Sequence, residues 1–312
     1  MVDVVLRQME ENDLTEVSSV DALAFGTLKG RTPEECEGSK RTINNLLSNW
    51  LECPEGCFVT EKEGTIVGFV FCHLWGAVGW VGTYAVLPSL QTRGIGKRLL
   101  SQALGYINKN HCQTVGLETM PGHPSNVGYY MGFGFQPDYM TILFHRNLTH
   151  PLDGSGVESN VCRSLSSLPD LDFLSSISGM VQPGLDYTIP ITRRLVDKEG
   201  ILLTFGPEGR DGFALVRLRP THNSDEGLTV PVKFLAINPS SELQLTDVVY
   251  AVERFSQEEG RESIIFPANT YYWNSVESFV KMGYKTIHTR LRMYQKVNRG
   301  NPNPTNLSSW VM

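Results

Sequence analysis

The 312-residue chain is long enough for two domains of ordinary size, and its composition is that of a folded protein. Hydrophobic residues make up 41% and charged residues 19%, which excludes a generally disordered chain. The formal net charge of −6 argues against a nucleic-acid partner, because such proteins usually present a basic face. No apolar run is long enough to cross a membrane and the first residues do not resemble a secretory signal, so we expect a cytoplasmic protein with no membrane partner.

The six cysteines are scattered along the chain. Cys53 and Cys57 lie four residues apart, but no second pair of Cys or His follows at the spacing of a zinc site. We therefore expect reduced, mostly buried thiols and no bound metal.

The first half of the chain alternates between strand-like and helix-like segments. Strands are predicted over residues 4–9, 57–64, 65–76, 78–88, 114–120 and 139–148. Helices are predicted from Asp13 onwards, over 39–51, over 95–107 and just before the GFGF segment at 132–135. The second and third strands form a hairpin with Glu63 and Gly64 at its turn.

The second half repeats this order of elements. Pro88 and Pro239 are 151 residues apart, and the pair Gly134-Phe135 recurs 149 residues later as Gly283-Tyr284. Two landmarks with nearly the same offset indicate a duplicated fold. We expect a first domain over 1–148, a Pro/Gly/Ser-rich linker over 149–160, a second domain over 161–297 and a flexible, Pro/Asn-rich tail over 298–312.

The strongest local signal is the segment QTRGIGK at residues 91–97, between a strand and an amphipathic helix. Glycines at this position let backbone N–H groups approach an anion, and the N-terminus of the following helix adds positive potential. The spacing lacks the third glycine of a dinucleotide fingerprint and the Gly-Lys-Ser/Thr end of a P-loop. The segment therefore indicates a pyrophosphate site of another kind, with Lys97 and Arg98 adding charge.

A second motif lies downstream, where Tyr130 stands four residues before Gly134 and Phe135. Together with the Q-x-x-G-x-G pattern after a strand ending V-x-P, it resembles the GNAT superfamily of N-acetyltransferases over about residues 4–148. The resemblance implies an α/β (α+β) protein with two tandem GNAT-like acyl-CoA N-acyltransferase folds, each a mixed, mostly antiparallel sheet flanked by helices.

The same resemblance implies acetyl-CoA as co-substrate and assigns residues to it. Backbone groups on the fourth strand would pair with the pantetheine arm, and one of their N–H groups would stabilise the oxyanion. These residues are Tyr84, Ala85 and Val86. The pyrophosphate would be held by Gln91, Thr92, Arg93, Gly94, Ile95, Gly96 and Lys97. Asn126 would lie near the pantetheine.

Tyr130 is the candidate general acid for the departing CoA thiolate, since a phenol is a suitable donor to a thiolate of similar basicity. The alternative is that Tyr130 only packs beside Tyr129. Cys72 and Cys112 are the candidates for an acyl-carrying nucleophile, and neither has a His at a recognisable spacing.

The general base is less determined by the sequence. The strand position that carries a carboxylate in some members of the family corresponds to about Trp80, which cannot accept a proton. Glu118 is the preferred replacement, with a solvated edge carboxylate as the alternative. His73, His123 and a chain of waters leading to bulk solvent are further options.

The second half has lost these features. Aligned on the two prolines, Glu242 stands opposite Gln91, Leu245 opposite Gly94 and Asp247 opposite Gly96. Aligned on the second motif instead, Phe279 stands opposite Tyr130. A branched side chain and an anion disfavour a phosphate. We expect a degenerate domain that covers the first domain's cleft and shapes the acceptor pocket, to which Tyr271, Tyr272 and Trp273 are candidate contributors.

These features predict an acetyl-CoA-dependent N-acetyltransferase that acts by direct transfer to an amine of a small molecule or peptide, as a monomer or homodimer. The alternatives are a transferase for a longer acyl-CoA, a non-catalytic acyl-CoA-binding sensor and a pure interaction scaffold.

Overall fold

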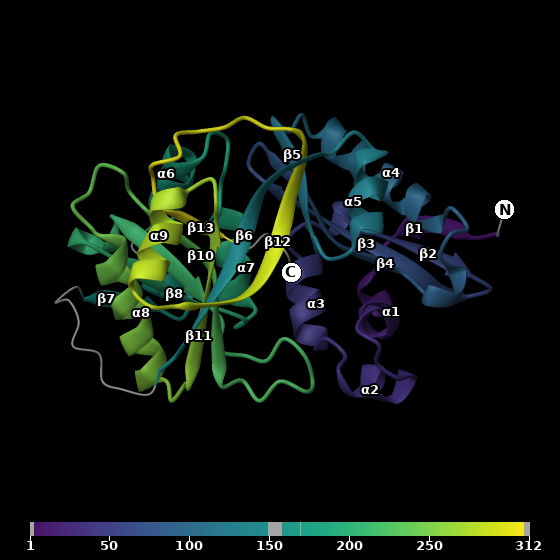
Figure 1. Cartoon of the computed structure of the whole chain (residues 1–312), viewed down its shortest axis with the longest axis horizontal. Coiled ribbons are helices and arrows are strands. Elements are labelled where there is room, and N and C mark those ends of the chain that lie inside the picture. Colours follow the sequence, from purple (N-terminus) through teal and green to yellow (C-terminus); the bar gives the residue numbers. More distant parts are fainter. Residues whose placement is uncertain (1–2, 149–157, 169, 309–312) are drawn as a thin grey trace.

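The computed structural model describes residues 3–148, 158–168 and 170–308 and shows two sheet-and-helix halves side by side (Figure 1). A 13-stranded sheet runs through both halves. In chain order its strands are β1 (Val5–Gln8), β2 (Phe58–Lys62), β3 (Thr65–Trp75), β4 (Val78–Val86), β5 (Thr114–Thr119), β6 (Gln136–Asn147), β7 (Ser159–Cys162), β8 (Ile201–Phe205), β9 (Gly212–Val216), β10 (Thr229–Ile237), β11 (Ser263–Asn269), β12 (Lys285–Lys296) and β13 (Asn306–Ser308).

Helices cover both faces of this sheet. They are α1 (Leu14–Leu28), α2 (Pro33–Gly38), α3 (Ile43–Trp50), α4 (Ile95–Lys109), α5 (Pro124–Met131), α6 (Asp172–Val181), α7 (Thr188–Val196), α8 (Leu245–Glu258) and α9 (Trp273–Lys281). The pairs β4–β5 and β10–β11 are parallel and the other paired strands are antiparallel, which confirms the predicted mixed, mostly antiparallel sheet. The hairpin turn at Glu63 and Gly64 is also confirmed, because both residues have positive φ.

The two halves exchange their last strands. The sheet order is β1-β2-β3-β4-β5-β12-β6-β11-β10-β9-β8-β7, so β12 of the second half lies between β5 and β6 of the first. Strand β6 in turn pairs with β11, with Phe144 opposite Phe266. In Figure 1, β12 crosses the middle of the molecule between the two groups of helices. The predicted boundaries at 148 and 161 therefore do not divide the hydrogen-bonded sheet.

Separate apolar cores hold the helices on the two faces. In the first half, α4 packs on one face through Leu99 and Ala103, while α1 packs on the other through Val17. In the second half, α8 and α9 cover one face and α6 and α7 the other. The core beneath α6 and α7 also contains Trp75 and Trp80 of the first half, so the halves share apolar burial as well as hydrogen bonds.

The predicted flexible tail is ordered up to Ser308, which corrects the sequence prediction. Residues 306–308 form β13, which pairs with Phe234, Leu235 and Ala236 of β10, and Leu307 is completely buried. The Pro/Asn-rich composition predicted a mobile tail, whereas the buried side chain of Leu307 and the pairing of Asn306 and Ser308 with β10 hold this short strand in place. The predicted linker is also shorter than expected, because Ser159 and Asn160 belong to β7, while residues 149–157 and Trp310 lie outside the described residues.

Replacing Leu307 with Ala tests whether β13 contributes to the folded state. We expect Leu307→Ala to destabilise the protein by about 2–4 kcal/mol, because it empties a filled core position. Thermal or urea unfolding measures this loss. The control is Pro302→Ala at an exposed position of the same segment, for which we expect a change within about 0.5 kcal/mol. Equal stability of the two variants would show that β13 is not part of the cooperative fold.

Candidate functional site

A fork between β4 and β5 is the centre of the candidate site. The two strands pair in parallel from Val78 opposite Thr114 to Val81 opposite Leu117, and no pairing between them continues beyond this point in the described residues. Between Val81 and Tyr84, β4 carries one residue more than its partner β3, which is a β-bulge. Residues Tyr84–Val86 therefore keep an edge without a strand partner on the side of β5.

The predicted glycine segment lies at the open end of this fork. Gly94 is the N-cap of α4 and has φ +84, a conformation that a residue with a Cβ rarely adopts. The first turn of α4 contains no acidic residue, and no side chain caps it. A cavity of about 590 Å³ adjoins this turn, lined by Arg93, Lys97 and Arg98 together with Val4 and Leu6. Free helix N–H groups beside three basic side chains are suited to an anion.

The segment is tied to β4 by its own side chains. The Gln91 side-chain amide donates to the Val86 carbonyl oxygen at 3.1 Å, while Thr92 is exposed and has φ +63. Gly96 lies on the inner side, where a Cβ would be 3.5 Å from the Tyr129 hydroxyl oxygen and 3.6 Å from the Tyr84 ring. The structure thus brings the residues predicted for pyrophosphate beside those predicted for pantetheine.

Tyr130 belongs to a group of three tyrosines at the fork. Its ring centroid is 5.5 Å from that of Tyr129 and 6.2 Å from that of Tyr84. Burial and the neighbouring phenol of Tyr129 raise the pKa of Tyr130 above its ordinary value, so its hydroxyl stays protonated at neutral pH. Gly134 is left-handed at φ +81, and the Phe135 N–H donates to the Tyr130 carbonyl at 3.2 Å. Asn126 is half-buried in the first turn of α5 and its predicted role stays untested.

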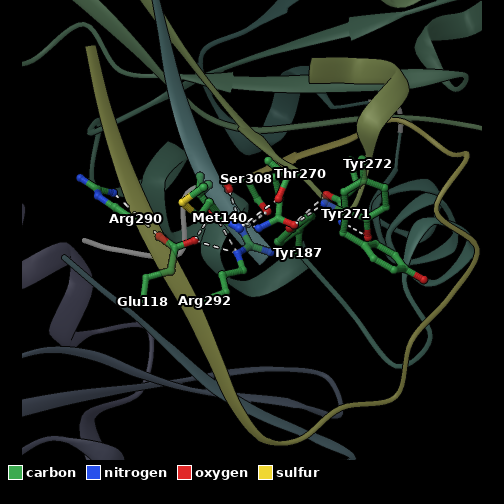
Figure 2. A network of polar contacts seen from close by, with 12 residues as sticks. Glu118, Met140, Tyr187, Thr270, Tyr271, Tyr272, Arg290, Arg292 and Ser308 are labelled. Atoms are coloured by element: carbon green, nitrogen blue, oxygen red, sulfur yellow. Dashed lines mark hydrogen bonds and ion pairs between the residues drawn. The ribbon is translucent and has the colours of Figure 1, made fainter. Parts of the chain in front are cut away.

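Glu118 lies on β5 one residue beyond the last paired position. Its side chain is buried, and its Oε1 accepts from Arg292 Nε at 2.7 Å and from the Thr141 hydroxyl at 2.6 Å. Arg290 is 4.0 Å from Oε2. Figure 2 shows Glu118 pointing toward both arginines of β12, with further contacts from Arg292 to Ser308. Glu118 is therefore at the fork, but both of its oxygens already face arginines of the second half, Oε1 in a close ion pair with Arg292 and Oε2 in a longer one with Arg290.

His73, the second option for the base, faces the bulge of β4. A Cβ built on Gly82 would lie 2.7 Å from His73 Nε2, so only glycine leaves room for the imidazole there. On the other side of the ring, Nδ1 lies 3.0 Å from Glu52 Oε2. A carboxylate at Nδ1 favours the tautomer with the proton on Nδ1 and leaves Nε2 as the proton acceptor. His123 instead caps α5 at a half-buried position.

Glu52 is a residue that the sequence analysis did not identify. Burial alone would raise the pKa of its carboxyl, but the charge of Arg194 and the hydrogen bond with His73 outweigh burial and lower that pKa to about 2. Arg194 comes from α7 and donates to Glu52 Oε1 at 2.7 Å. No local pattern marks this Glu52–His73 pair, because its members come from the turn after α3 and from β3.

The cysteines do not offer a nucleophile or a metal site. All six are buried, and none is in a disulfide in the structure. Burial raises the pKa of the Cys72 and Cys112 thiols, which disfavours the reactive thiolate. Among the described residues, no group of three or more His, Cys, Asp or Glu side chains could hold a metal ion. In the same part of the chain, no helix is long and apolar enough to span a membrane.

The second half has a corresponding fork, but its own chain fills it. Strands β10 and β11 pair in parallel up to Pro231 opposite Ile265, and a register shift follows in β10. The next residues, 234–236, correspond to 84–86 of the first half at an offset of 150 residues, and β13 pairs with them. The C-terminal strand thus takes the edge that stays free in the first half.

The other second-half positions also differ from the first half. The N-cap of α8 is Gln244, which has an extended backbone. Aligned on the two N-caps, Gly94 corresponds to Gln244 and not to Leu245, so the predicted alignment was one residue off. Asp247 lies in the first turn of α8, where it opposes an anion. The Tyr284 N–H donates to the Phe279 carbonyl at 3.0 Å, which repeats the contact made at Tyr130. Phe279 is fully buried and has no hydroxyl.

Comparisons with known proteins agree with this geometry. The acetyltransferase (GNAT) family model matches residues 24–135. A putative acetyltransferase from Pyrococcus horikoshii superposes with a TM-score of 0.68 at 16% identity, covering 98% of this chain and 95% of that chain. A GCN5-related N-acetyltransferase from Sphaerobacter thermophilus gives 0.58 at 13%, covering 96% and 98%.

A tandem GNAT protein from the clavulanic acid biosynthesis pathway gives a TM-score of 0.59 at 13% identity, covering 97% of this chain and all of that chain (100%). These likenesses establish the fold over nearly the whole chain, and the family model places the recognisable domain in the half with the open fork. Residues 24–135 match the acetyltransferase (GNAT) family model, and the chain as a whole has the fold of a tandem GNAT protein.

Proposed function

We propose that the protein is an acetyl-CoA-dependent N-acetyltransferase with one cofactor site, in its first half. The observation that carries the proposal is the open fork at Tyr84–Val86, which ends at a glycine turn and has Tyr130 beside it. The same edge in the second half is taken by β13. Calorimetry with acetyl-CoA and thiol release in the presence of an amine test binding and turnover separately.

The residues of the first half fit acetyl-CoA as a substrate. The backbone of Tyr84–Val86 would pair with the pantetheine amides as an added strand does. The first-turn N–H groups of α4 and the side chains of Arg93 and Lys97 would hold the pyrophosphate. Backbone N–H groups released by the bulge would stabilise the oxyanion that forms when an amine attacks the thioester carbonyl.

The proton transfers are assigned to two side chains on opposite sides of the fork. Tyr130, kept protonated by burial, donates its proton to the leaving thiolate. His73 Nε2 accepts the proton that the amine loses, and Glu52 stabilises the imidazolium that results. Glu118, which we predicted as the base, already accepts two hydrogen bonds on Oε1, and we assign its Oε2 to binding the acceptor amine.

Substituting Gly94 with Val tests the anion site. A β-branched residue at φ +84 is strained by about 1–3 kcal/mol, and the turn would have to move away from its present shape. We expect acetyl-CoA to bind at least about tenfold more weakly, which corresponds to about 1.4 kcal/mol. The control is Gly105→Ala in the exposed middle of α4, where we expect unchanged affinity. Unchanged affinity of Gly94→Val would place the cofactor elsewhere.

Removing the Tyr130 hydroxyl tests the general acid. We expect Tyr130→Phe to lower kcat by about 100-fold with unchanged acetyl-CoA affinity, because the substitution removes the proton donor and keeps the ring. The matched control is Tyr129→Phe, which removes a neighbouring hydroxyl, keeps its ring and should change kcat less than about threefold. Equal effects of the two substitutions would contradict the assignment.

Substituting His73 tests the general base. We expect His73→Asn to lower kcat by about 100-fold, because the amide can still bond Glu52 but cannot accept the amine proton. The control is His123→Asn, which should leave kcat close to that of the wild type. A kcat of His73→Asn close to that of the wild type would return the base assignment to Glu118 or to water.

A further inference from the structure

The side chain of Trp80 covers the closed end of the fork. Paired positions on β3, β4, β5 and β12 place four residues in one row on the same face of the sheet, namely His73, Trp80, Gly116 and Tyr294. Gly116 has no side chain, and the indole takes the space above it, because a Cβ at Gly116 would lie 2.2 Å from Cζ3 of Trp80. The indole therefore reaches from β4 across β5, one row before the last pair of these two strands.

Side chains of both halves hold the indole in this place. Trp80 is fully buried, and its ring lies edge-on to Tyr294 of β12 with the centroids 5.8 Å apart. The guanidinium carbon of Arg292 is 5.9 Å from the ring centroid, and Trp75 stacks on Trp80 at 6.5 Å. A side chain packed in this way cannot turn aside without disturbing its neighbours, so the indole has a fixed position at the fork.

The proposed pantetheine arm would lead toward this indole. The Gln91 side chain bonds the Val86 carbonyl, so Val86 is the end of the open edge nearest the glycine turn and Tyr84 is the far end. An arm that starts from a pyrophosphate at the turn would run from Val86 to Tyr84, and its thioester would lie at the bulge beside Gly82. The acyl carbons beyond the carbonyl would then point to the closed end of the fork, where Trp80 lies.

Both faces of the sheet are filled at the closed end. On the face toward α4, Val81 and Leu117 are buried in the core beneath that helix, and an acyl chain could enter only by displacing them. On the opposite face the indole of Trp80 lies first, and the ion pair between Glu118 and Arg292 lies beside it. An alkyl chain that passed the indole would come to rest against buried charged groups, which is unfavourable for both.

We propose that Trp80 restricts the acyl donor to acetyl-CoA by closing the space beyond the thioester carbonyl. The inference rests on the proposed acetyl transfer, since it names the residue that selects the donor of that reaction. The methyl group of an acetyl thioester ends before the indole, whereas a longer chain meets it. Because Tyr294 and Arg292 hold the indole, the second half takes part in selecting the donor that the first half binds.

Calorimetry of the full chain with coenzyme A, acetyl-CoA and hexanoyl-CoA tests this role without an acceptor. We expect hexanoyl-CoA to bind the wild type at least about tenfold more weakly than acetyl-CoA does, because its chain does not fit. Trp80→Ala should bind hexanoyl-CoA at least about tenfold more tightly than the wild type does, since each methylene buried in the vacated space adds about fourfold in affinity. Coenzyme A itself has no acyl group and should bind both proteins equally.

Two further variants complete the experiment. Trp80→Leu keeps an apolar side chain in the core and replaces Trp80→Ala if that protein does not fold, and we expect it to gain at least about threefold in hexanoyl-CoA affinity. The control is Trp50→Leu, which removes an indole of α3 that donates to the Met9 carbonyl and should keep the wild-type ratio of the two thioester affinities.

The outcomes separate this inference from the proposed function. Equal affinities of acetyl-CoA and hexanoyl-CoA for the wild type, or an unchanged ratio in the Trp80 variants, would overturn the role of Trp80 and leave the cofactor site standing. A wild type that binds neither coenzyme A nor either thioester would overturn the proposed cofactor site and this inference with it.

Discussion

The position of β12 between β5 and β6 is the constraint on which the rest of the structure depends. A strand of the second half completes the sheet of the first, and a strand of the first half, β6, completes the sheet of the second through β11. Because hydrogen bonds of both halves run through these two strands, neither half can close its sheet alone. The same exchange brings Arg290 and Arg292 next to Glu118, so the contacts at the fork follow directly from the strand order.

The two halves keep the same framework but use it differently. Both have a parallel strand pair, β4–β5 or β10–β11, that diverges after a few residues. Both also have a glycine with positive φ, Gly134 or Gly283, directly before an aromatic residue and after the last helix of that half. In the first half the freed strand edge stays open, whereas in the second half β13 pairs with it and Leu307 fills the core beneath. A free strand edge has unpaired backbone N–H and C=O groups, and β13 pairs with those of β10. The entropic cost of this pairing is low because β13 belongs to the same chain.

The polar face of α3 explains how the region between the halves can hold so many charges. Asn45, Ser48 and Asn49 are buried on one side of this helix, and the Asn49 side chain accepts from Arg194 of the second half. Apolar burial between the halves is provided instead by Trp75, Trp80 and the core under α6 and α7. This division leaves the part of the interface nearest the fork polar.

Much of the fold could be predicted because it is encoded by local patterns. Strand and helix periodicity, the turn at Glu63 and Gly64, and the glycine before α4 depend on residues close together in the chain, and so does the spacing from Tyr130 to Gly134. The exchange of strands, the docking of β13 and the partners of Glu118 were not predictable in this way. Glu52 meets Arg194 across 142 residues and Glu118 meets Arg292 across 174, and no periodicity relates residues that far apart. The sequence by itself determined the two folds and the glycine turn, while only the tertiary structure decided which half keeps an open fork and which side chains face it, because packing between distant segments sets both.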